Sequence, residues 1–170
     1  FATSFAHAQS ACPEDPTAEV ERGIAAIWDA YRRVDEAAFD RSSKALNAAI
    51  ACLDEVPSPA LVTRLHQAMS VAAFVNGQTR ACRRALAAGR LMDPSWKVTD
   101  DLFPEGHPFR DLFGAATDPG PVENIGKINP KLWVVDGIER DEAPTERAFL
   151  LQVQEGDVIV WSGYLFDWEG

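Results

Sequence analysis

Hydrophobic residues recur every three to four positions along the first two thirds of the chain, a spacing that predicts four α-helices. Their apolar stripes comprise, in chain order, Val20, Ile24, Ile27, Trp28, Tyr31; Phe39, Leu46, Ile50, Leu53; Leu61, Leu65, Ala68, Ala72, Val75; and Cys82, Ala85, Leu86, Gly89. Asp15, Asp35 and Ser58 stand where a helix needs a side chain to cap its first free N–H groups. Gly77 and Pro94 follow the third and fourth stripes as stop signals. Because the connections are short, consecutive helices are expected to pack as antiparallel hairpins.

Residues 65–94 carry a regularly spaced set of small and turn-forming residues: Ser70, Gly77, Cys82, Leu86, Gly89 and the Asp93-Pro94 pair. This set is in register with the tetratricopeptide pattern, so the stretch resembles one helical hairpin of that repeat family. His66 and Ala73 stand where the pattern usually has Trp and Tyr. The resemblance extends over residues 16–113, with the first two helices as a more degenerate copy and a short helix from Pro108 closing the stack. It implies a scaffold that stacks and binds.

Beyond the turn-rich residues 116–121 the hydrophobic period changes to two, which predicts strands over residues 131–135, 147–154 and 157–166. Asp136-Gly137 predicts a tight hairpin turn after the first of them. The last strand is apolar on both faces, so it is expected to be covered on both sides. With Val134-Val135-Asp136-Gly137, the segment resembles PEGA-type and immunoglobulin-like modules of bacterial envelope proteins. A complete sandwich of that kind has about seven strands, so this one is expected to leave edges unpaired.

Residues 1–9 alternate strictly between larger and small side chains, which predicts an extended strand. The sequence therefore predicts an α+β fold with an N-terminal extended strand, an α-helical hairpin (TPR-like) domain and a C-terminal small antiparallel β domain. The expected boundaries are residues 1–11, 12–115 and 130–170, with a linker over residues 116–129.

The net charge of −10 argues against nucleic acid or an anionic membrane surface as the partner, because both attract clustered cations. Residues 1–115 contain 15 acidic and 12 basic residues, a net charge of −3. Residues 116–170 contain 11 acidic and 4 basic residues, a net charge of −7. Arg80, Arg83 and Arg84 form a basic row at helical spacing in the less acidic part. Two interpretations stay open: ordinary solvated surfaces, or an acidic end that docks on the basic face of a neighbouring copy. No apolar run reaches the ~20 residues of a membrane span.

Three cysteines are present, and a hairpin of the first two helices would bring Cys12 and Cys52 together. This favours a Cys12–Cys52 disulfide, with Cys82 as a buried thiol; three unpaired cysteines of a cytosolic protein are the alternative. Ala6-His7-Ala8 resembles a signal-peptidase site, although the apolar segment that should precede it is missing from the sequence. We expect a bacterial protein that is secreted or displayed at the cell surface after an upstream signal is removed.

No set of residues predicts a reaction. His7, His66 and His107 are far apart and form no metal-binding pair; His66 is expected to pack within its helix and His107 to form a turn. Residues 120–128 lack the spacing and the Ser/Thr of a phosphate-binding loop. The aromatic residues of the β segment are typical of a core or an interface, with a ligand platform as the alternative. We therefore expect no enzyme, no catalytic residue, no metal, no cofactor and no small-molecule ligand.

The leading strand lacks a sheet and the β segment lacks strands, which favours a non-enzymatic subunit of an extracellular filament. Its partner is another copy of itself: the N-terminal strand of one copy would enter the β module of the next, head to tail. The predicted interface consists of Phe1, Thr3, Phe5, His7, Trp133, Val135, Val158, Val160, Trp161, Tyr164 and Phe166. The alternative is a monomeric TPR-type adaptor of the periplasm or cytosol, whose peptide groove would include His66 and Asn76.

Overall fold

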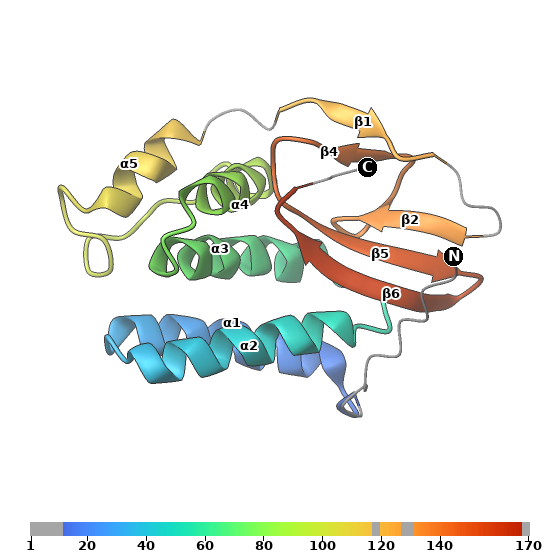
Figure 1. Ribbon diagram of the computed structural model, residues 1–170, viewed down its shortest axis with the longest axis horizontal. Helices are drawn as coiled ribbons and strands as arrows, with labels where there is room; N and C mark the ends of the chain where they lie inside the picture. The colour runs from blue at the N-terminus through green and yellow to red at the C-terminus, as the bar shows by residue number, and fades with distance from the viewer. Residues whose placement is uncertain (1–11, 117–119, 127–130, 168–170) are drawn as a thin grey trace, which may run out of the picture.

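A computed structural model describes residues 12–116, 120–126 and 131–167 and has the α+β architecture that the sequence predicts (Figure 1). Five helices come first and short antiparallel strands follow. The helices are α1 (Pro16–Arg32), α2 (Glu36–Ala51), α3 (Pro59–Val75), α4 (Thr79–Met92) and α5 (Pro108–Ala115). The strands are β1 (Val122–Asn124), β2 (Lys131–Val135), β3 (Ile138–Glu139), β4 (Glu142–Pro144), β5 (Phe149–Glu155) and β6 (Val158–Leu165).

The helices pair as two hairpins, α1 with α2 and α3 with α4, as expected from their short connections. The predicted caps are confirmed: Asp15 and Asp35 accept hydrogen bonds from the backbone N–H groups of Ala18 and Ala38, at 2.8 and 2.9 Å. Ser58 caps α3 in the same way. The α1–α2 packing is close, since a Cβ at Gly23 would lie 3.0 Å from the Cβ of Leu46.

The strands form two sheets, a four-stranded one in the order β3-β2-β5-β6 and a two-stranded one from β1 and β4. The predicted hairpin turn is confirmed: Val135 pairs with Ile138, and Asp136 and Gly137 between them both have positive φ, at 52° and 80°. These are the dihedrals that a two-residue turn between twisted strands requires. β1 lies within residues 116–129, the segment expected to be a linker.

The helices and the four-stranded sheet share one hydrophobic core. Ala148 and Leu150 are fully buried in the same cluster as the helix stripes, and Tyr164 and Phe166 pack against it. The opposite face of the sheet has a smaller cluster of Val135, Phe149 and Leu151. Ala143 of β4 packs into this cluster from the two-stranded sheet. The sheet therefore lies between the helices and the two-stranded sheet, as Figure 1 shows.

Polar contacts fix the sheet against α4 and against the loop that follows α2. The Gln152 amide donates to the carbonyl oxygen of Glu55 at 3.0 Å. The backbone N–H of Ala148 donates to the carbonyl oxygen of Arg84 at 3.1 Å. The Arg84 guanidinium in turn donates to the carbonyl oxygen of Phe166 and pairs with the carboxylate of Asp167. Part of the basic row on α4 thus holds an acidic residue of its own chain. No helix among the described residues is both long and apolar enough to cross a membrane.

The predicted disulfide between Cys12 and Cys52 is present, and Cys82 is a buried free thiol. The bond joins the segment before α1 to the end of α2 across 40 residues of sequence, so it closes the first hairpin covalently. Burial raises the pKa of the Cys82 thiol to about 12, so this third cysteine stays protonated at neutral pH.

Reducing the Cys12–Cys52 bond should lower the free energy of unfolding by about 4 kcal/mol, the chain-entropy value for a closed loop of this length. Urea unfolding with and without reductant measures the change. The Cys12→Ser variant should match the reduced protein and should not respond to reductant. Equal unfolding midpoints for the oxidised and reduced protein would contradict this prediction.

Candidate functional site

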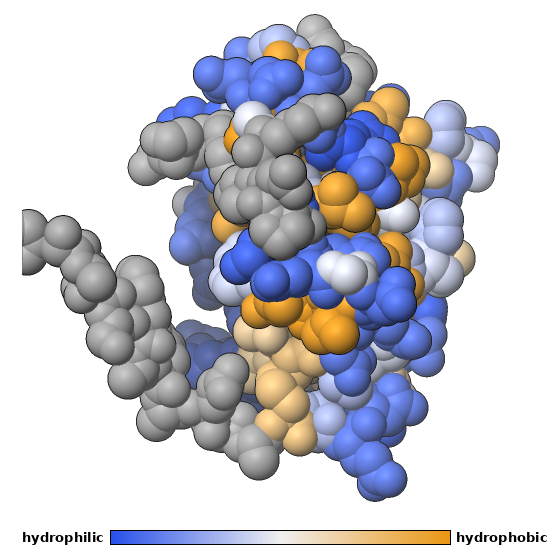
Figure 2. Space-filling view, turned by 90° about the vertical axis from the view of Figure 1, so that its right-hand side faces the viewer, coloured by the Kyte–Doolittle hydropathy of each residue, from blue (hydrophilic) through white to orange (hydrophobic). Residues whose placement is uncertain are grey.

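Strand β6 forms an edge of the four-stranded sheet, because among the described residues it pairs only with β5. Its first half is exposed: Val158, Val160 and Trp161 keep 60%, 47% and 45% of their surface accessible. The expectation that this strand is covered on both sides is therefore wrong for that half. Figure 2 views the end of the molecule where the β5–β6 turn lies and shows apolar side chains at the surface among hydrophilic ones. Exposed apolar residues on a free edge are typical of a surface that another strand can pair with.

The pairing of β6 with β5 contains an irregularity next to this exposed stretch. Trp161 pairs with Val153 and Ile159 with Gln154, so Val160 has no partner on β5. Such a bulge bends the strand and increases its twist. It leaves Val160 and Trp161 as consecutive exposed side chains at the edge.

The outer face of the sheet carries a row of large side chains that leads to this edge. Trp133 of β2 pairs with Val153, which pairs with Trp161. The Trp133 indole N–H donates to the carbonyl oxygen of Gly126 at 3.0 Å. The Trp161 ring lies over Gly163, where an added Cβ would come within 2.5 Å of the indole. The two indoles thus lie on one face, separated by one valine.

The remaining residues of the predicted interface lie elsewhere. Val135 is fully buried under the two-stranded sheet, and Tyr164 and Phe166 pack toward the helices. These three side chains belong to the core of their own subunit. The last four members of the set, Phe1, Thr3, Phe5 and His7, lie outside the described residues.

A buried polar network connects α3 to the sheet and was not predicted. His66 Nε2 lies 3.2 Å from Asp136 Oδ1, and the Arg147 guanidinium lies 2.6 Å from Asp136 Oδ2. The Tyr164 hydroxyl lies 2.8 Å from His66 Nδ1. Because a carboxylate only accepts, His66 donates from Nε2 to Asp136, and its Nδ1 forms a second hydrogen bond, with the tyrosine hydroxyl.

The network resembles a catalytic constellation in composition, but its geometry gives it a structural role. His66 has no exposed surface, and Asp136 and Arg147 are almost fully buried. Asp136 also accepts from the backbone N–H of Leu150 at 2.9 Å, so both carboxylate oxygens are satisfied. A substrate has no access to these atoms. His66 packs within its helix, as expected, but its partners lie in the β2–β3 turn and in β6, about 70 and 100 residues away, which no local pattern signals.

The buried charges shift two acid–base equilibria. Burial alone would raise the pKa of Asp136, but the hydrogen bond from His66 and the charge of Arg147 outweigh it and lower that pKa below its usual value. Burial raises the pKa of the Tyr164 hydroxyl well above its usual value. The carboxylate is therefore charged and the tyrosine neutral throughout the physiological pH range.

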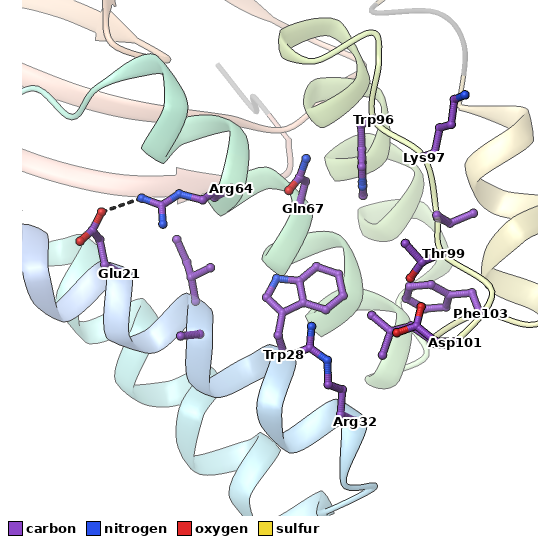
Figure 3. A pocket seen from close by; sticks show the side chains of 14 residues that line it. Glu21, Trp28, Arg32, Arg64, Gln67, Trp96, Lys97, Thr99, Asp101 and Phe103 are labelled. Carbon is purple, nitrogen blue, oxygen red and sulfur yellow. Dashed lines mark hydrogen bonds and ion pairs between the residues drawn. The ribbon is translucent and has the colours of Figure 1, made fainter.

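The first helices of the two hairpins, α1 and α3, line a cavity of about 500 Å3 together with residues 96–103 (Figure 3). A peptide-binding adaptor would be expected to use this cavity. Neither residue predicted for its groove takes part: His66 is buried against the sheet, and Asn76 is exposed at the end of α3. In the part of the chain that the structure describes, no three His, Cys, Asp or Glu side chains form a group that could hold a metal ion.

No family model, curated protein or solved structure matches this chain. The exposed edge of β6 and the cavity between α1 and α3 are the surface features on which a function can be built.

Replacing Asp136 by Asn should lower the free energy of unfolding by about 3–5 kcal/mol at neutral pH, because the variant leaves the buried Arg147 without its counter-charge. Since folding lowers the pKa of Asp136, its stabilising effect is complete above the unfolded-state pKa of about 3.9 and is lost as the pH falls through the folded-state pKa. The difference between wild type and variant should therefore shrink below about pH 4. Urea unfolding at a series of pH values measures it.

Two further substitutions calibrate that experiment. Tyr164→Phe removes only the hydroxyl bound to His66 and should cost about 1–3 kcal/mol. Glu139→Gln changes an exposed carboxylate on the neighbouring β3 and should change stability by less than about 0.5 kcal/mol. If Asp136→Asn behaves like Glu139→Gln, the buried network does not stabilise the fold.

Proposed function

We propose that this chain is a non-enzymatic structural subunit that polymerises head to tail, the N-terminal segment of one copy adding as a strand to β6 of the next. One observation carries the proposal: β6 is a sheet edge whose first half exposes Val158, Val160 and Trp161. The same chain contains, in residues 1–9, an uncharged alternating sequence that suits such an edge. Strand addition joins backbone groups that an open edge otherwise leaves to water.

The side chains of an added strand would supply the specificity. Because the period of a strand is two, Phe1 and Phe5 would lie on one face, about 14 Å apart. On the outer face they would continue the row of Trp133, Val153 and Trp161 across the new edge. Burying two phenylalanines contributes roughly 3–6 kcal/mol before the cost of ordering the segment. Such a contact joins two different surfaces, so it extends indefinitely unless its rotation closes a ring.

The disulfide fixes where this segment leaves the body of the subunit. Cys12 is bonded to Cys52 at the end of α2, and α2 lies beside β6. Figure 1 shows the start of α1, the end of α2 and the β5–β6 turn at the same end of the molecule. The eleven preceding residues span at most about 40 Å, enough to reach a neighbouring copy. The same reach lets the segment return to its own β6, so assembly should depend on concentration.

In this proposal the hairpins are tetratricopeptide-like repeats that serve as body and spacer, and the β part is an envelope-type module. Disulfide bonds persist in oxidising compartments, which supports a secreted or cell-surface location. The adaptor alternative is favoured less, because two hairpins offer a short groove and such stacks usually need three or more repeats.

Deleting residues 1–9, or replacing Val158 and Val160 by lysine, should convert polymers into monomers. The deletion removes the donor strand, and the lysines place charges where that strand would be buried. Sedimentation velocity over a range of concentrations measures the assembly state. A synthetic peptide of residues 1–9 should bind the deletion variant and should shorten wild-type polymers by occupying the acceptor edge.

Leu91→Lys is the matched control, since it places the same charge at a comparably exposed apolar position on α4. It should polymerise like wild type. A wild-type protein that stays monomeric at high concentration, with its disulfide intact, would refute the proposal. The proposal would also be refuted if the double lysine variant of Val158 and Val160 polymerised as well as wild type.

A further inference from the structure

The cavity between α1, α3 and residues 96–103 has no role in the assembly proposed above, because the two surfaces share no residue. Its volume of about 500 Å3 lies within the range of about 300–1,000 Å3 that is typical of ligand pockets. Figure 3 shows side chains from all three segments directed into the same space, among them Trp28, Gln67 and Trp96. The chemistry of this lining indicates what it could hold.

Two tryptophans give the cavity large aromatic surfaces. Trp96 is seated firmly: its ring packs over Gly89, where an added Cβ would lie 2.9 Å from the indole, and meets Phe113 edge to face at 5.0 Å. Trp28 of α1 meets Phe103 edge to face at 6.5 Å. Both indoles are only half-buried, so part of each ring is open to a ligand. Rigid aromatic faces bind apolar C–H surfaces at a low cost in side-chain entropy.

The polar groups around these rings are mixed in kind and nearly balanced in charge. Arg64 of α3 and Glu21 of α1 pair at one side of the cavity at 2.6 Å, the bond drawn in Figure 3. A hydrogen bond from Thr99, with the charge of Arg32, lowers the pKa of Asp101, which therefore stays ionised. The complete charged lining comprises Arg32, Arg64, Lys97, Glu21 and Asp101, a net charge of only +1.

We propose that this cavity binds a neutral carbohydrate chain. A sugar ring presents a C–H face that stacks on an indole and a rim of hydroxyls that both donate and accept hydrogen bonds. The lining offers donors and acceptors together in Gln67, Thr99 and the paired charges. A phosphate or carboxylate ligand would require concentrated cations, whereas here two carboxylates, Glu21 and Asp101, offset two of the three positive charges. An extended peptide is the competing ligand, because its backbone also donates and accepts hydrogen bonds, and the titration below distinguishes it from a sugar.

The test is calorimetric titration of the full chain with chitotriose, cellotriose, maltotriose and mannotriose, each at up to about 1 mM, a range that detects weak binding. At least one of them should bind. Ala25→Trp, at an exposed position of the lining, should fill the cavity and weaken that binding by about tenfold or more. Ala45→Trp, at an exposed position of α2 outside the lining, is the matched control and should bind as wild type does.

A spectroscopic readout locates the ligand independently. Of the five tryptophans, Trp28 and Trp96 should show shifted indole N–H resonances on saturation, while Trp133 and Trp161 should not. Absence of binding by all four sugars, or equal binding by Ala25→Trp and wild type, would overturn the proposal. So would binding of hexaglutamate or of an unrelated neutral hexapeptide in place of the sugars. None of these results depends on polymerisation, which the edge variants test separately.

Discussion

The rest of the structure depends on one buried carboxylate, Asp136, and on the groups that surround it. It lies in the turn between β2 and β3 and meets His66 of α3, Arg147 before β5 and the backbone of Leu150. A buried charge is costly unless its hydrogen bonds are complete, so the helices and the sheet fit together in few relative positions. Hydrophobic burial between the two layers is less directional, so the network, together with the Gln152–Glu55 and Ala148–Arg84 hydrogen bonds, orients the sheet on the helices.

That orientation has a direct consequence for β6. Tyr164 near its end is bound to His66, and Phe166 beyond it is held by Arg84 on α4. The strand is therefore fixed at the end that faces the helices, whereas Val158 to Trp161 extend beyond this contact and stay exposed. In the proposed assembly, an edge strand on a firmly held sheet would accept a further strand with little ordering cost of its own.

In the folded chain, part of the basic row of α4 pairs with an acidic residue of the same subunit. The basic row of α4 suggested an acidic partner, and part of it is satisfied within the subunit, since Arg80 and Arg84 both lie near Asp167. The proposed assembly thus depends on strand pairing and apolar contact, without attraction between opposite charges. The cavity between the hairpins is likewise close to neutral, although the chain as a whole carries −10.

The sequence by itself determined the helices, their caps, the Asp136-Gly137 turn and the disulfide, because periodicity, capping and turn formation depend on neighbouring residues. It also predicted the main strands, and among the described residues the two edge strands of the larger sheet, β3 and β6, each pair on one side only. Only the tertiary structure decided which aromatic residues are buried: Tyr164 faces the helices, whereas Trp161, three residues earlier, is exposed beside a bulge. The sequence also did not predict the partners of His66 or the cavity beside Trp28, because each joins segments far apart in the sequence. Such contacts follow from how the layers pack, and no local pattern of residues contains that information.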